Sequence, residues 1–170
     1  LSLHDALPIS QNVQFHYDLG HNLSKDLSNR PAVTTTVEMF KPDKWGSTFL
    51  FTDIDYKNDG AVGAYWEISR EFSITKNKRW AAHIEYNGGA ATGELATGYY
   101  GNRFQHAALF GGAWNWANKD FSKTFSVQLM YKYYFKNKTT GAHPFNGFQL
   151  TEVWRSEEHT SELQSLREIS

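Results

Sequence analysis

Side chains able to bind a small polar molecule recur at alternate positions along much of this 170-residue chain. In an extended segment, residues at every second position point to the same face, so these side chains would share one surface. Aromatic rings on such a surface can stack on a flat solute, while carboxylates, amides and cations can bind its hydroxyl groups. The chemistry offered is therefore solute binding. The candidate residues are Glu38, Phe51, Asp53, Glu67, His83, Glu85, Arg103, Gln128 and Lys132.

Two pairs of residues could suggest a metal or acid–base site. His83 and Glu85 stand two residues apart, and so do His16 and Asp18. Such spacing is common by chance on strands, so no metal site is predicted. Charged residues on an enclosed face usually pair with one another, because an isolated charge away from water is costly. Structural pairing is therefore favoured over solute contact for the charged candidates Glu38, Glu67, Glu85, Arg103 and Lys132.

The sequence lacks the motifs that mark common catalytic and cofactor sites. It has no GxSxG, P-loop, HExxH or glycine-rich dinucleotide motif, and no cysteine. Lys and Arg total 17 and Asp and Glu total 18, so the net charge of -1 gives no field that would attract nucleic acid. The composition predicts a protein that is not an enzyme, has no cofactor and does not bind nucleic acid.

The elements that would carry these side chains are β-strands. Aromatic residues make up 16% of the chain although the mean hydropathy is only -0.58, as expected of strands with rings on one face and polar groups on the other. No apolar run approaches the roughly 20 residues of a transmembrane helix. About eight strands are predicted, at residues 13–19, 33–40, 47–56, 61–74, 80–86, 103–116, 121–135 and 145–154.

The connections between these strands alternate between short turns and longer polar loops. Residues 41–46 and 58–60 carry Pro or Gly punctuation and predict tight turns, while residues 20–31 and 88–102 predict loops. The double glycine at 111–112 predicts a bulge or bend. This order predicts an all-β fold, an antiparallel up-and-down transmembrane β-barrel. A soluble barrel or sandwich, with the aromatic face as its core, is the alternative.

Tryptophans near the predicted strand ends support the membrane interpretation. In outer-membrane barrels, aromatic side chains form girdles at the level of the lipid headgroups. The predicted girdle residues are Trp45, Trp80, Trp114 and Trp116.

Both ends of the chain resemble translated sequencing-adapter DNA rather than protein. Codons of a common short-read adapter decode to RSEEHTSELQS at residues 155–165, and those of the opposite adapter decode to LSLHDALPI at residues 1–9. We therefore expect residues 1–10 and 155–170 to be artefacts, and residues 11–154 to be the genuine segment. On this interpretation the native start lies upstream, and a signal peptide for export is missing from the segment.

The stretch TTTVEMFKPDKWGSTFLFTDIDY (residues 34–56), followed by YWEISREFSITKNKRW (65–80), resembles the Tsx-type family of nucleoside-specific outer-membrane channels. The segment resembles more closely a sister family of uncharacterised Tsx-like proteins with a domain of unknown function. The shared features are the glutamate at 38, the Asp-Lys-Trp turn at 43–45, the acidic end of the third strand, and the Glu-Ile and Phe-Ser-Ile steps at 67–68 and 72–74.

The resemblance implies a barrel of about twelve strands, of which this segment would hold eight. It further implies a monomer in the Gram-negative outer membrane, in contact with lipid and lipopolysaccharide, that passes small solutes such as nucleosides through its lumen. Two alternatives remain open: a structural outer-membrane barrel that does not conduct, and a soluble lipocalin-like binding barrel.

Overall fold

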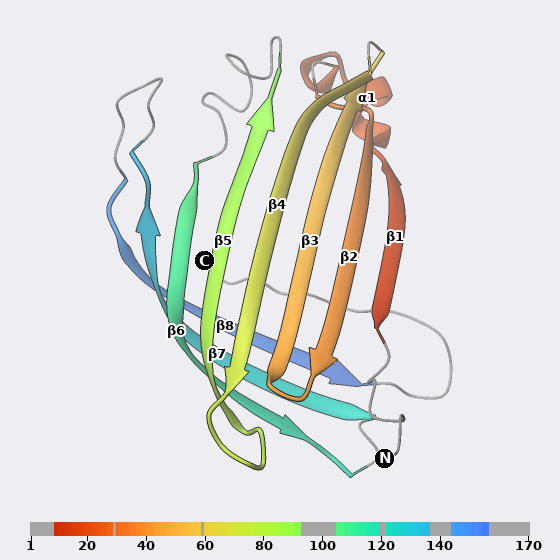
Figure 1. Ribbon diagram of the computed structural model, residues 1–170. Coiled ribbons are helices and arrows are strands. Elements are labelled where there is room, and N and C mark those ends of the chain that lie inside the picture. Colours follow the sequence, from red (N-terminus) through yellow and green to blue (C-terminus); the bar gives the residue numbers. More distant parts are fainter. Residues whose placement is uncertain are drawn as a thin grey trace.

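A single curled antiparallel sheet makes up nearly the whole structure (Figure 1). The computed structural model describes residues 9–28, 30–58, 60–92, 105–119, 122–136 and 144–156. The strands are β1 (Ser10–Tyr17), β2 (Val33–Asp43), β3 (Gly46–Lys57), β4 (Gly60–Ser73), β5 (Trp80–Ala91), β6 (Ala107–Ala117), β7 (Lys123–Tyr134) and β8 (Gly147–Ser156). Each strand pairs with the next along the chain, so the sheet order is β1 to β8 without a crossover.

The sheet forms a half-barrel. Its edges are β1 and β8, which do not pair with each other, and the strands between them curve into an open trough (Figure 1). The prediction of an all-β, antiparallel, up-and-down fold is confirmed. None of the helices in the described part of the chain is long and apolar enough to cross a membrane.

The two ends of the trough differ. The β2–β3, β4–β5 and β6–β7 connections lie at one end, here called the turn end, which is lower in Figure 1. The opposite end, here called the loop end, carries the β1–β2 connection, which was predicted to be a loop without helix. It contains the short helix α1 (Leu19–Leu23) and the 3₁₀ turn η1 (Lys25–Leu27). The Asp18 side chain explains the helix start, since it accepts a hydrogen bond from the Gly20 backbone N–H at 2.9 Å.

Strand register divides the side chains between the two faces of the sheet. Residues that pair across neighbouring strands point to the same side, so Glu38, Phe51, Glu67 and Asn87 form one row across β2 to β5. This face is the concave one, where the few buried side chains lie. The alternate positions form the convex face. The predicted alternation of the seventh strand is confirmed in β7, where Val127 and Leu129 lie opposite in phase to Gln128 and Lys132.

Several predicted boundaries were wrong, most clearly at the end of β5. The residues from Gly88 to Ala91 were predicted to begin a loop, but they continue β5 and pair with β4. Gly88 is a strand residue because its missing side chain leaves room for two rings: a Cβ there would lie 2.8 Å from Nδ1 of His106 and 3.1 Å from Nε1 of Trp66. β8 also runs past its predicted end at Trp154, to Ser156.

The double glycine was predicted to mark a bulge or bend, and no bulge is found there. The β5–β6 and β6–β7 registers run through Gly111 and Gly112 without a shift. The bulge lies instead between β3 and β4, at Asp55 and Tyr56. Gly111 serves close approach, because a Cβ there would lie 2.1 Å from the carbonyl oxygen of Leu129 on β7.

The apolar core is small for a sheet of this size. The buried hydrophobic residues in the described part of the chain are Ala81, Ala107, Leu109, Ala113 and Met130, of which only Leu109 and Met130 are large. Four polar side chains, including those of His83 and Asn87, are buried beside them. The concave face is therefore filled mainly by polar groups.

Candidate functional site

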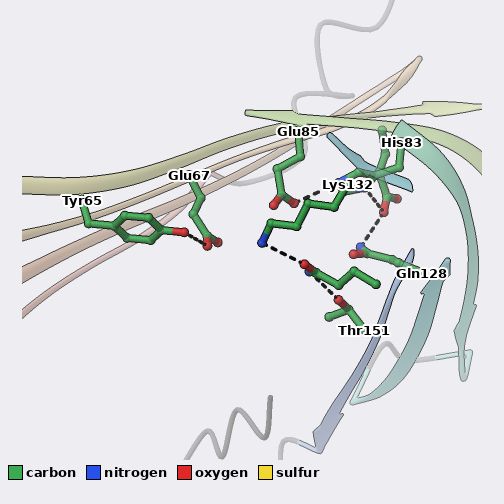
Figure 2. Close-up of polar contacts among 9 residues, drawn as sticks. Tyr65, Glu67, His83, Glu85, Gln128, Lys132 and Thr151 are labelled. Carbon is green, nitrogen blue, oxygen red and sulfur yellow. Dashed lines mark hydrogen bonds and ion pairs between the residues drawn. The ribbon is translucent and has the colours of Figure 1, made fainter. Parts of the chain in front are cut away.

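The concave face brings together all the predicted solute-binding residues that the structure describes. Glu38, Phe51, Asp53, Glu67, His83, Glu85, Gln128 and Lys132 all share it. Arg103 lies outside the described residues. Figure 2 shows side chains of β4, β5, β7 and β8 projecting toward one another inside the trough. Structural pairing, the interpretation favoured for the charged candidates, is observed directly for Glu85 and His83.

Glu71 is the centre of the polar network, and the sequence analysis missed it. One of its carboxylate oxygens, Oε1, lies 3.3 Å from Nδ1 of His83 and accepts a hydrogen bond from the Gln128 amide at 3.0 Å. The other, Oε2, accepts a hydrogen bond from the Asn115 amide at 2.9 Å. One carboxylate on β4 thus ties together β5, β6 and β7, across the most strongly curved part of the sheet (Figure 1).

A signal for Glu71 did exist in the sequence. Glu71 and His83 are direct partners in the β4–β5 register. They lie at equal distances from Asn77, in the turn that joins the two strands. Pairing the predicted strands outward from that turn would have placed the carboxylate against the imidazole.

His83 is held on both sides by carboxylates. Its Nε2 lies 3.2 Å from Oε2 of Glu85, while Nδ1 faces Glu71, and the residue is only 3% exposed. Both ring nitrogens are therefore engaged, which leaves neither free to coordinate a metal. A buried imidazolium between two carboxylates is a fully paired arrangement, and it acts as a brace between neighbouring strands.

Hydroxyl groups hold the acids of β3. The Thr34 hydroxyl donates to Asp55 at 2.5 Å, and the Thr36 hydroxyl donates to Asp53 across the β2–β3 pair. A hydroxyl donor satisfies a carboxylate oxygen without neutralising its charge. Asp53 and Asp55 thus bring two hydrogen-bonded carboxylates to the concave wall at β2 and β3.

Aromatic and amide groups complete the space shown in Figure 2. The Tyr65 hydroxyl donates to Oε1 of Glu67 at 2.6 Å, and the Tyr65 ring meets that of Phe51 edge-on, with centroids 6.4 Å apart. Across the trough, Nζ of Lys132 donates to Oε1 of Gln149 at 3.2 Å. The amide of Gln149 in turn donates to the Thr151 hydroxyl. Rings, carboxylates, amides and one ammonium group thus face a common volume.

The convex face has the opposite character. It carries large apolar side chains that are roughly half exposed or more, including Ile68, Ile84, Phe110, Leu129 and Leu150. The predicted girdle tryptophans Trp80, Trp114 and Trp116 lie on this face near the turn end, and Trp45 lies in the β2–β3 turn. Trp114, Phe125 and Trp154 form a continuous row of ring contacts there, with centroids 6.2 Å and 5.7 Å apart.

An ion pair marks the boundary of the apolar surface at the turn end. Arg70 binds Asp43 in bidentate fashion, with N···O distances of 2.7 Å and 3.0 Å, and also donates to the Thr48 hydroxyl. Asp43 sits at the turn itself, outside the apolar surface. Hydrogen bonds from the Arg70 guanidinium, and then from the Trp45 backbone N–H, hold the pKa of the Asp43 carboxyl below its usual range.

The fold and its two faces define the class of this molecule: an up-and-down antiparallel half-barrel, polar on its concave face and apolar on its convex face. The chain belongs to the family described as a domain of unknown function (DUF5020), which matches it over residues 10–165. No curated protein and no solved structure matches the chain.

Proposed function

We propose that this half-barrel is part of a membrane-spanning β-barrel that lets small polar solutes pass along its concave face. The inverted distribution of polarity carries the proposal. Charged and amide side chains form the enclosed network around Glu71 and His83, while large apolar side chains such as Phe110 and Leu129 face outward. A barrel in lipid is built in this way, whereas a barrel in water is apolar inside.

The strand lengths suit a membrane. β3 has 12 residues and β4 has 14, so at about 3.3 Å per residue they reach about 40 Å or more. Strands tilted by about 40° would then cross the roughly 25 Å apolar band of an outer-membrane barrel, with residues to spare at each end. The exposed aromatic side chains on the convex face near the turn end occupy the level expected for a girdle.

The concave face supports polar solutes as cargo. Phe51 and Tyr65 offer ring edges and faces, and Glu67 lies within hydrogen-bond reach of the Tyr65 hydroxyl. Together they suit a solute with a flat ring and hydroxyl groups, and a nucleoside has both. The resemblance of residues 34–56 and 65–80 to nucleoside channels supports the same cargo, and the proposed location is the outer membrane.

A barrel that does not conduct is the second candidate. The observation that favours it is the network itself, because Glu71, His83, Asn115 and Gln128 close part of the enclosed space with paired side chains. A soluble lipocalin-like binder fits less well, since its interior would be apolar and its exterior polar.

Conductance of the reconstituted protein tests the proposal. The protein is inserted into planar bilayers and examined for single-channel current in potassium chloride. Discrete current steps are expected, and nucleosides added to the bath should partially block them. Swelling of proteoliposomes in isosmotic solutions of a nucleoside and of a disaccharide measures passage of uncharged solutes.

Each outcome separates the candidates. Current steps and faster swelling in the nucleoside support the channel. Stable insertion with neither current nor swelling identifies the non-conducting barrel. A protein that stays dissolved without detergent and does not insert overturns the membrane proposal.

A further inference from the structure

Basic side chains gather around the turn end of the half-barrel. Among the described residues up to Trp154, seven exposed cations belong to the turns and strand ends there: Lys41, Lys44, Lys76, Lys78, Arg79, Lys119 and Lys123. The acids near them in the described part of the chain are few. Asp43 is bound by Arg70, Glu71 lies in the concave network, and Glu152 is exposed on β8.

The opposite end shows no such excess. At the loop end, the described charged residues are four cations, Lys25, Arg30, Lys57 and Lys136, and three acids, Asp18, Asp26 and Asp55. Two of these residues form an ion pair, with Nε of Arg30 3.2 Å from Oδ2 of Asp18. Among the described residues, positive charge is therefore concentrated at the turn end.

Tryptophan is concentrated at the same end. Of the six tryptophans in the chain, five lie in or near the turn-end segments: Trp45, Trp80, Trp114, Trp116 and Trp154. Cations and indole rings are adjacent there: Nζ of Lys44 lies 5.1 Å from the centroid of the Trp45 ring, and Arg79 directly precedes Trp80. Near Trp45, Nζ of Lys78 donates to the Asp43 carbonyl oxygen at 3.2 Å.

We infer that the turn end is a docking surface for the anionic headgroups of membrane phospholipids. Indole rings settle at the headgroup level of a bilayer, and long basic side chains beside them reach the phosphates. An anionic leaflet attracts each nearby Lys or Arg by about 1 kcal/mol, which is about a fivefold gain in binding. The inference rests on the membrane part of the proposed function, and it adds the class of lipid headgroup that the turn end meets.

Tryptophan quenching by brominated lipids tests this surface, because most of the indoles lie beside it. The protein is reconstituted into vesicles that contain brominated phosphatidylglycerol or brominated phosphatidylcholine in varied proportion. Competition between the two gives the relative binding constant of the anionic lipid at the protein surface. The variant carries K76Q, K78Q and R79Q in the β4–β5 turn. The matched control carries K25Q, K57Q and K136Q at the loop end.

The expected result is a several-fold preference of the native protein for phosphatidylglycerol, which falls to no preference in the turn-end variant. High salt should weaken the preference, whereas inorganic phosphate at equal ionic strength should weaken it no further, because the partner is a lipid surface rather than free phosphate. The control variant should retain the preference. A native protein without preference, or equal loss in both variants, would overturn the inference. Failure of any brominated lipid to quench would instead contradict membrane insertion itself.

Discussion

At the scale of single residues, the arrangement around His83 explains why so polar an interior can be stable. Each nitrogen of the imidazole faces a carboxylate, and Glu71 also receives two amide donors. A buried charge is tolerated only when partners satisfy it. For the same reason the stability of the network is sensitive to mutation, because loss of one member leaves the others buried without a partner.

Replacement of His83 by leucine should strongly destabilise the sheet. The H83L variant leaves Glu71 and Glu85 buried without their cationic partner, and breaking such a pair typically costs about 3 to 5 kcal/mol. The free energy of unfolding, measured by guanidinium titration in detergent, checks this. The control is H16L, the same substitution at an exposed histidine on β1. Equal stability of the two variants would show that the brace is unimportant.

At the scale of the elements, β6 and β7 come unusually close together at Gly111. Gly111 points into the concave side, where a Cβ would lie 2.8 Å from Cα of Met130 as well as against the Leu129 carbonyl. Gly112 faces the other way, and the nearest atom to its added Cβ is the Ala81 carbonyl oxygen at 3.9 Å. Two adjacent glycines thus have different roles.

Alanine substitution at each glycine separates the two roles. G111A forces β6 and β7 apart and should lower the free energy of unfolding by about 2 kcal/mol, within the usual range for overpacking. G112A meets only ordinary van der Waals contact and should change stability by less than about 0.5 kcal/mol. Thermal unfolding of both variants in the same detergent measures the difference, and an unaffected G111A would refute the close-approach role.

The strands were predictable from sequence wherever polar and apolar residues alternate strictly. β7 is the best case, since Gln128 and Lys132 alternate with Val127 and Leu129, and only Met130 interrupts the pattern between them. The end of β5 was not predictable, because glycine and alanine carry no polar–apolar pattern, and the rings of Trp66 and His106 that explain Gly88 lie on other segments. Site residues on the same strand, such as His83 and Glu85, could be found from their spacing in the sequence. The contacts of Glu71 cross between strands, so finding them required the strand register.

At the scale of the whole molecule, a mutation on the exposed apolar surface can test whether the convex face meets lipid or water. Leu129 lies near the middle of β7 and is 55% exposed. In a soluble protein, replacement of such a residue by lysine would change stability by less than about 0.5 kcal/mol. In lipid, a lysine near the middle of the apolar band costs about 2 to 4 kcal/mol.

L129K should therefore lower the unfolding free energy of the vesicle-bound protein by about 2 to 4 kcal/mol. The control is Q14K, which places the same charge on the concave face of β1 and should have little effect. Urea or guanidinium titration in phosphatidylcholine vesicles provides the measurement. If L129K leaves the free energy of unfolding unchanged, the convex face is surrounded by water.

The open edges at β1 and β8 have a consequence for how such a molecule could enter a membrane. In the described part of the chain, each edge strand presents a line of backbone amide and carbonyl groups without a neighbour, and in hydrocarbon every such group costs several kcal/mol. If the molecule enters lipid as we propose, the trough cannot enter before those edges are paired. Insertion and closure of this open seam would then be one concerted step with a high barrier. In water, before that step, the same seam would recruit any extended strand it encountered, so the time spent unsealed determines the risk of aggregation.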